Sequence, residues 1–174
     1  IALKQDLIAT LLEHGGRTRT NVDGWIARSG FNSGRTRSYV QLYRNGTLES
    51  VTYWERWEVD GMVFLPGTAF DEDVHRVLQS LQQLYGAIGV AGPVAAMVSL
   101  IGMKGWRMGA GPRHSLSERH FDRAPLLCPE VVLDSIDGDV LPLAKPLLDL
   151  AWNAAGFSQS MNYDQTGKWN PIRS

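Results

Sequence analysis

The chain has 174 residues, of which 44% are hydrophobic and 20% are charged, and its formal net charge is −1 at pH 7. This length and composition predict one folded domain over residues 1–174 and exclude a disordered tail. The small net charge excludes an overall attraction to nucleic acid or membranes, so any such binding must come from a local patch. The long uncharged segment over residues 78–103 is interrupted by glycines and a proline, which excludes a membrane-spanning helix.

Cys128 is the only cysteine, which excludes an intrachain disulfide and favours a cytoplasmic location. Its apolar neighbours predict a buried thiol with no reactive role. The sequence begins with Ile1 and carries no apolar leader segment there, so we expect a module of a longer protein whose N-terminal part precedes it.

The first expected element is an amphipathic helix over residues 2–14, because its leucines recur at helical spacing. Residues 15–38 are rich in Gly, Ser, Asn and Arg and predict a loop, so that residues 1–37 form a helix plus a basic loop.

The segment 39–51, YVQLYRNGTLESV, predicts a β-hairpin, because Asn-Gly favours a two-residue type I′ turn between alternating strands. Such a turn pairs Leu42 with Glu49 and brings Arg44 close enough to Glu49 for an ion pair. Residues 61–65 predict a third strand.

The clearest helical pattern covers residues 68–88, and Thr68 with Asp71 matches a capping box at its start. The nearly continuous apolar run 93–101 predicts a central strand covered on both faces, with residues 105–108 as its antiparallel partner.

The remaining expected elements are a basic loop, a strand broken at a proline, a helix and a polar tail. They cover, in that order, residues 110–125, 126–136, 142–155 and 158–174. Short turns between neighbouring strands and one long crossover helix predict the α+β class, with a mixed, mostly antiparallel sheet and helices packed on it.

Arginines interleaved with tyrosines can contact phosphates and stack on bases, so two basic clusters are candidates for a nucleic-acid surface. Between Arg17 and Arg44 there are six arginines and one acid, Asp23, and a second cluster lies between Lys104 and Arg123. The candidate residues are Arg17, Arg19, Arg35, Arg37, Tyr39, Tyr43, Arg44, Lys104, Arg107 and Arg113. The alternative is that these arginines pair with the chain's 18 acidic residues or contact a partner domain.

No catalytic residue, metal or cofactor is predicted. His114, Glu118 and His120 share one short loop, but its arginines favour a solvated basic loop over a zinc site. The glycines that follow residue 101 are not followed by the helix that a phosphate-binding loop requires.

Five strings occur in one order between residues 38 and 170: YVQLYRNGTLESV, VSLIGMKGWRMG, LLCPEVVLD, LLDLAWNAAGF and SMNYDQTGKW. Together they resemble the C-terminal domain of bacterial proteins whose N-terminal half is a Schlafen-type, AlbA-like DNA-binding domain, also described as ATP-binding or helix-turn-helix proteins. The resemblance implies a bacterial cytoplasmic protein linked to nucleic acid, and it transfers no catalytic residue. It also implies the N-terminal domain of the parent protein as a partner. The other expected partners are a second copy in a homodimer and nucleic acid, and no membrane is expected.

The leading hypothesis is therefore a non-catalytic regulatory or interaction module. The first alternative is direct binding of DNA or RNA through the arginine-rich hairpin region. The second is an enzyme acting on a nucleotide or phosphodiester, which would use the loop at 102–123 with Glu130 or Asp134.

Overall fold

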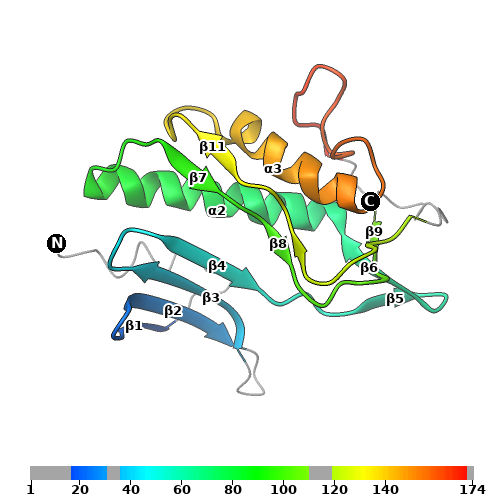
Figure 1. Cartoon of the computed structure of the whole chain (residues 1–174), viewed down its shortest axis with the longest axis horizontal. Helices are drawn as coiled ribbons and strands as arrows, with labels where there is room; N and C mark the ends of the chain where they lie inside the picture. The colour runs from blue at the N-terminus through cyan, green and yellow to red at the C-terminus, as the bar shows by residue number, and fades with distance from the viewer. Residues whose placement is uncertain (1–16, 31–35, 110–118, 172–174) are drawn as a thin grey trace. The chain divides into compact units, whose positions relative to one another are not determined.

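The computed structural model describes residues 17–30, 36–109 and 119–171 (Figure 1). It divides into two compact units, one made of Ile1–Trp54 and Arg76–Ala91 and the other of Glu55–His75 and Gly92–Ser174. Over the described residues the chain has the expected α+β class, with two helices and mostly antiparallel sheets. No helix in this part of the chain is long and apolar enough to cross a membrane. The expected helix over 2–14 lies outside the described residues, and the expectation of a single domain stays a prediction.

The first unit contains a four-stranded antiparallel sheet in the order β1-β2-β3-β4 (Figure 1). Its strands are β1 (Arg17–Thr20), β2 (Gly24–Gly30), β3 (Thr36–Tyr43) and β4 (Leu48–Thr52). The predicted loop over 15–38 is therefore wrong, because most of its described residues are strands. The polar residues between β1 and β2 make a tight turn. In this turn, Asn21 Oδ1 accepts hydrogen bonds from the N–H groups of Asp23 (3.1 Å) and Gly24 (2.8 Å).

The hairpin of β3 and β4 is present, but its register differs by one residue from the prediction. Leu42 pairs with Leu48, and Gln41 pairs with Glu49. The carbonyl of Tyr43 accepts a hydrogen bond from Gly46 N–H at 3.0 Å, and Gly46 alone in the turn has positive φ (89°). This geometry is the longer hairpin loop that ends in a left-handed glycine, not the two-residue type I′ turn.

The one-residue shift moves Glu49 to the opposite face of the sheet from the one predicted. The predicted ion pair with Arg44 is therefore wrong. Arg44 Nε instead donates to the carbonyl of Val22 at 2.9 Å, while Glu49 accepts hydrogen bonds from Tyr39 and Tyr43.

The core of the first unit lies on the sheet face that carries Ala27, Val40 and Leu42, which are at most 4% exposed. The helix α2 (Gly67–Ile88) confirms the predicted helix over 68–88, and residues from Arg76 onward belong to this unit. Within the unit, Tyr85 donates its hydroxyl to the carbonyl of Gly46 at 2.7 Å, which ties the helix to the hairpin turn.

The second unit contains a three-stranded sheet in the order β5-β6-β9, formed by β5 (Trp57–Val59), β6 (Met62–Pro66) and β9 (Arg107–Gly109). Strand β6 confirms the strand predicted at 61–65. Strand β9 runs parallel to β6, so the prediction that residues 105–108 pair with 93–101 is wrong. Gly102 and Gly105 both take positive φ between the two segments, and the chain there leads to β6 rather than folding back.

Residues 94–133 also supply a two-stranded ribbon, made of two successive antiparallel pairs. Strand β7 (Val94–Ala96) pairs with β11 (Val131–Leu133), and β8 (Ser99–Leu100) pairs with β10 (Leu126–Leu127). The predicted strand over 126–136, broken at Pro129, is thereby confirmed. The prediction that 93–101 is covered on both faces is wrong, because each strand here has one neighbour and its alternate residues are exposed.

Helix α3 (Val140–Ala154) packs against β11 (Figure 1). It confirms the helix expected over 142–155 and begins two residues earlier, because Asp139 caps it through a hydrogen bond from Leu141 N–H to its side chain (3.0 Å). Gly156, with φ of 88°, follows the helix end, as expected.

Candidate functional site

Three of the predicted binding residues of the first unit, Arg19, Tyr39 and Tyr43, lie on the second face of the β1–β4 sheet, which we call the Tyr39 face. It consists of the residues that alternate with the buried Ala27, Val40 and Leu42. Register places Arg28 beside Tyr39, and it places Arg19, Ile26, Gln41 and Glu49 in one row across the four strands. An open depression of about 480 Å³ lies here, lined by Asn21, Asp23, Ile26, Arg28, Tyr39, Gln41, Tyr43 and Glu49.

Glu49 organises the aromatic half of the Tyr39 face. Its Oε2 accepts hydrogen bonds from the hydroxyls of Tyr39 (2.9 Å) and Tyr43 (3.3 Å). Burial, followed by the hydrogen bond to Glu49, raises the pKa of Tyr39, and the charge of Glu49 raises the pKa of Tyr43. Both phenols therefore stay protonated near neutral pH and act as donors to the carboxylate.

Two amide side chains, those of Asn21 and Gln41, line the same depression. Asn21 Nδ2 donates to Gln41 Oε1 at 2.9 Å, and Gln41 is only 4% exposed. The depression thus combines aromatic rings, amides and charges of both signs. This combination suits a ligand that carries both hydrogen-bonding edges and charge, rather than a phosphate alone.

The other predicted residues do not join the Tyr39 face in the same way. Arg44 lies at the hairpin turn with its Nε bound to Val22, and Arg17 is placed on β1 only by its register with Arg28. Lys104 and Arg107 belong to the second unit, and Arg35 and Arg113 lie outside the described residues. Arg37 is half-buried in β3.

Arginines of the second cluster support the alternative that this residue type serves packing and ion pairs. The Arg119 guanidinium lies 5.0 Å from the centre of the Phe157 ring. Arg123 Nε contacts Asp122 Oδ1 at 3.1 Å, and this exposed pair lowers the pKa of Asp122.

A second surface, which the sequence did not predict, is the exposed face of the β7–β8 and β10–β11 ribbon. Four large apolar side chains are exposed there: Met97 (68%), Ile101 (77%), Leu127 (67%) and Val132 (61%). They alternate with inward residues such as Leu100 and Leu133, which are 5% exposed. We call these four residues the ribbon stripe.

Two acidic residues accompany the ribbon stripe. Cys128 N–H bonds to Val98 O, and Val131 pairs with Ala96, so Pro129 and Glu130 together lie opposite the single residue Met97. Glu130 and Asp134 are exposed and share the alternation of Val132. Within the described part of the chain, neither carboxylate has a hydrogen-bond or ion-pair partner.

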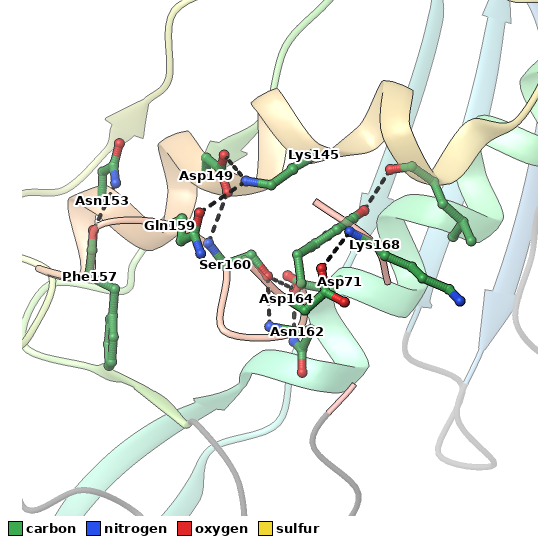
Figure 2. Close-up of polar contacts among 12 residues, drawn as sticks. Asp71, Lys145, Asp149, Asn153, Phe157, Gln159, Ser160, Asn162, Asp164 and Lys168 are labelled. Atoms are coloured by element: carbon green, nitrogen blue, oxygen red, sulfur yellow. Dashed lines mark hydrogen bonds and ion pairs between the residues drawn. The ribbon is translucent and has the colours of Figure 1, made fainter. Parts of the chain in front are cut away.

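A buried polar cluster around Asp71 fixes the C-terminal tail onto the second unit (Figure 2). Asp71 Oδ1 accepts a hydrogen bond from Trp152 Nε1 (2.9 Å), and Oδ2 accepts from Ser160 Oγ (2.5 Å) and Asn162 Nδ2 (2.8 Å). Asp71 is fully buried, and Thr68 donates to Asn162 Oδ1 at 2.9 Å, so the side chains of both predicted capping-box residues bond to the C-terminal tail. Burial raises the pKa of Asp71 to about 6, against the lowering effect of its three donors.

His75 and Tyr163 form an adjoining buried pair, with 2.7 Å between His75 Nε2 and the Tyr163 hydroxyl. That hydroxyl donates to the carbonyl of Leu141, also at 2.7 Å, so it accepts from His75, whose proton is therefore on Nε2. Burial lowers the pKa of His75 to about 4, so the ring is neutral near pH 7. Because these groups bond one another, we interpret them as a structural anchor.

Two groups named by the enzyme hypothesis, and the single cysteine, can be placed in the structure. Glu130 and Asp134 lie on the exposed ribbon face, and Cys128 is buried, which raises its pKa. No set of three or more His, Cys, Asp or Glu residues within 17–30, 36–109 and 119–171 could hold a metal ion. His114 and Glu118, weighed above as zinc ligands, lie outside these ranges.

Comparison of the chain with protein-family models, with curated proteins and with solved structures finds no match.

Proposed function

We propose that this chain is a protein-interaction module and that the ribbon stripe receives a segment of a partner polypeptide. The observation that carries the proposal is the exposure of Met97, Ile101, Leu127 and Val132, each above 60%, on one face of the ribbon. Scattered exposed apolar residues are ordinary, but adjacent ones on one face favour an interaction site. Burying these four side chains would contribute roughly 4–8 kcal/mol before the cost of association.

The negative charge beside the ribbon stripe limits which kind of partner segment can bind there. Any segment that covers Met97 also approaches Glu130, and a carboxylate that loses its water without gaining a partner costs several kcal/mol. The partner must therefore supply Lys or Arg next to its apolar residues. A second copy docking by the same face would bring its own Glu130 and Asp134 to this surface, so the proposed occupant is an apolar segment with basic residues from another protein or domain.

The wider setting, a bacterial protein linked to nucleic acid, rests on the resemblance of residues 38–170. It stays a prediction, as do the N-terminal domain of the parent protein as a partner and the cytoplasmic location.

Isothermal titration with a designed probe tests the proposal. The probe is an amphipathic peptide of leucines and lysines, and its control is the same peptide with glutamates in place of the lysines. We expect the lysine peptide to bind and the glutamate peptide to bind at least about tenfold more weakly, the equivalent of one lost charge-assisted contact.

Two variants locate the binding. Ile101→Ser should weaken the lysine peptide at least about tenfold, because it removes an anchor that is 77% exposed. Val22→Ser is the matched control, since Val22 is 84% exposed but belongs to the first unit. Equal losses in the two variants would contradict the proposal. Light scattering that finds a dimer broken by Ile101→Ser would replace the partner with a second copy.

A further inference from the structure

The Tyr39 face carries arginines on two of its strands, and tyrosines with a glutamate on the other two. Arg19 on β1 and Arg28 on β2 are both exposed and bring positive charge to one half of the sheet. Tyr39 and Tyr43 on β3 and Glu49 on β4 bring rings and a hydrogen-bond acceptor to the other half. The depression described above lies between these halves and is lined by residues of both.

The width of this arrangement matches a nucleotide. Neighbouring strands lie about 4.8 Å apart, so Arg28 on β2 and Glu49 on β4 are separated by about 10 Å across the sheet. A nucleotide lying across the strands would place its phosphate near the arginines and its base over the tyrosines. Arginine and tyrosine are the residue types that contact phosphates and stack on bases in single-strand binding proteins.

The carboxylate of Glu49 would make such a site prefer some nucleotide bases over others. Both tyrosine hydroxyls bond to its Oε2, and among the described residues no donor bonds to its Oε1. An ionised carboxylate only accepts hydrogen bonds, so it favours a base edge that carries neighbouring donors. The Watson–Crick edge of guanine presents an N–H and an adjacent amino group. In a duplex that edge is already paired, so only a single strand can offer it.

We propose that the Tyr39 face binds single-stranded nucleic acid across β1–β4, with Arg19 and Arg28 at phosphates and Glu49 at the Watson–Crick edge of guanine. This inference is independent of the ribbon stripe, which belongs to the other unit. The negative charges of Asp23 and Glu49 limit how many phosphates the depression itself can hold. The contacts to phosphate are therefore assigned to the β1–β2 half alone.

Fluorescence anisotropy with labelled oligonucleotides tests the inference. The probes are oligouridylates of about nine nucleotides, a length within the site sizes of single-strand binding folds, that carry one central guanine, adenine or cytosine, with a duplex as control. We expect the guanine strand to bind at least about fivefold more tightly than the adenine strand, the low end of a two-bond base contact. We expect the duplex to bind more weakly than either.

Variants separate the phosphate contacts from the base contact. Arg28→Ala should weaken all single strands alike and reduce the slope of log affinity against log salt by about 0.7, the value for one phosphate on a single strand. Glu49→Gln should abolish the guanine preference, because an amide presents both a donor and an acceptor. Lys104→Ala is the matched control, since it removes one exposed positive charge from the second unit.

Three results would overturn the inference. No binding of any strand at low salt removes the site altogether. An equal loss in Arg28→Ala and Lys104→Ala removes the assignment to the Tyr39 face. A guanine preference that survives in Glu49→Gln removes the role of Glu49.

Discussion

Replacing Ser160 with alanine tests the buried cluster that holds the C-terminal tail. Ser160 is 0% exposed, and its Oγ both donates to Asp71 Oδ2 (2.5 Å) and accepts from Asn162 N–H (3.2 Å). The substitution Ser160→Ala removes both hydrogen bonds and leaves a buried carboxylate with one donor fewer (Figure 2). A hydrogen bond to a charged group contributes about 1.5–3 kcal/mol and a neutral one about 1 kcal/mol. We therefore expect the free energy of unfolding to fall by about 2–4 kcal/mol at neutral pH.

The loss should depend on pH. Burial holds the pKa of Asp71 at about 6, above its ordinary value, so the carboxyl is protonated in the folded protein below that pH. A raised carboxyl pKa means that stability is lost as the pH rises through that pKa. Removing a donor raises the pKa further, so the variant loses additional stability above about pH 6. The difference between Ser160→Ala and the unmodified protein should therefore be smaller near pH 4.5 than at neutral pH.

Urea unfolding, followed through tryptophan fluorescence because Trp152 belongs to the cluster, measures both effects. Ser158→Ala is the matched control, since Ser158 is exposed. Ordinary surface substitutions change the free energy of unfolding by at most about 0.5 kcal/mol. The reasoning would be refuted if the free energies of unfolding of Ser160→Ala and Ser158→Ala differed by no more than this at neutral pH. So would a loss of equal size at both pH values.

Two further predictions concern stability. The first tests a buried hydrogen bond in the second unit, and the second compares two glycines of the first unit. Tyr163→Phe leaves the buried His75 N–H without its acceptor and should lower the free energy of unfolding by about 1–3 kcal/mol in urea titrations, and an unchanged midpoint would contradict the assigned tautomer. Gly24→Ala should lower the melting temperature strongly, because a Cβ there would lie 2.2 Å from the carbonyl oxygen of Leu42 and φ is +148°. Gly86→Ala, in an open position of α2, should instead stabilise the protein by about 0.5–1 kcal/mol. Similar melting temperatures for the two alanine variants would refute this contrast.

The two helices could be predicted because their signals are local. Apolar residues recur at helical spacing over 68–88, and the leucine-rich segment over 142–155 ends at Gly156. Packing did not override these local signals. The α+β class was predicted correctly from the order of these helices and the short strands between them. The buried state of Cys128 was also predictable, since an apolar neighbourhood in the sequence became an apolar neighbourhood in space.

The errors have specific physical causes. In the hairpin, Asn-Gly is compatible with more than one loop length, and the longer loop moved Glu49 from beside Arg44 to beside Tyr39. Asp71 has the spacing of a helix cap, but its true partners lie about ninety residues away in the chain. The spacing of neighbouring residues in the sequence cannot reveal hydrogen bonds to residues so far away in the chain.

The ribbon stripe was missed for a related reason. A continuous apolar run such as 93–101 is typical of a strand covered on both faces, and nothing in the run reveals that one face lacks a cover. The Tyr39 face was found in part, because Tyr39 and Tyr43 of β3 occur among the arginines of the first basic cluster. Arg28 and Glu49 joined it only through strand pairing.

Methyl NMR during titration with the lysine peptide tests the central proposal most directly, because it shows where a partner lies. With labelled Ile, Leu, Val and Met methyl groups, we expect the signals of Met97, Ile101, Leu127 and Val132 to shift together and saturate. The Val22 signal should stay in place, since Val22 is exposed in the other unit. Unmoved ribbon-stripe signals at saturating peptide, or equal shifts with the glutamate peptide, would contradict the proposal that this face binds an apolar segment with basic residues.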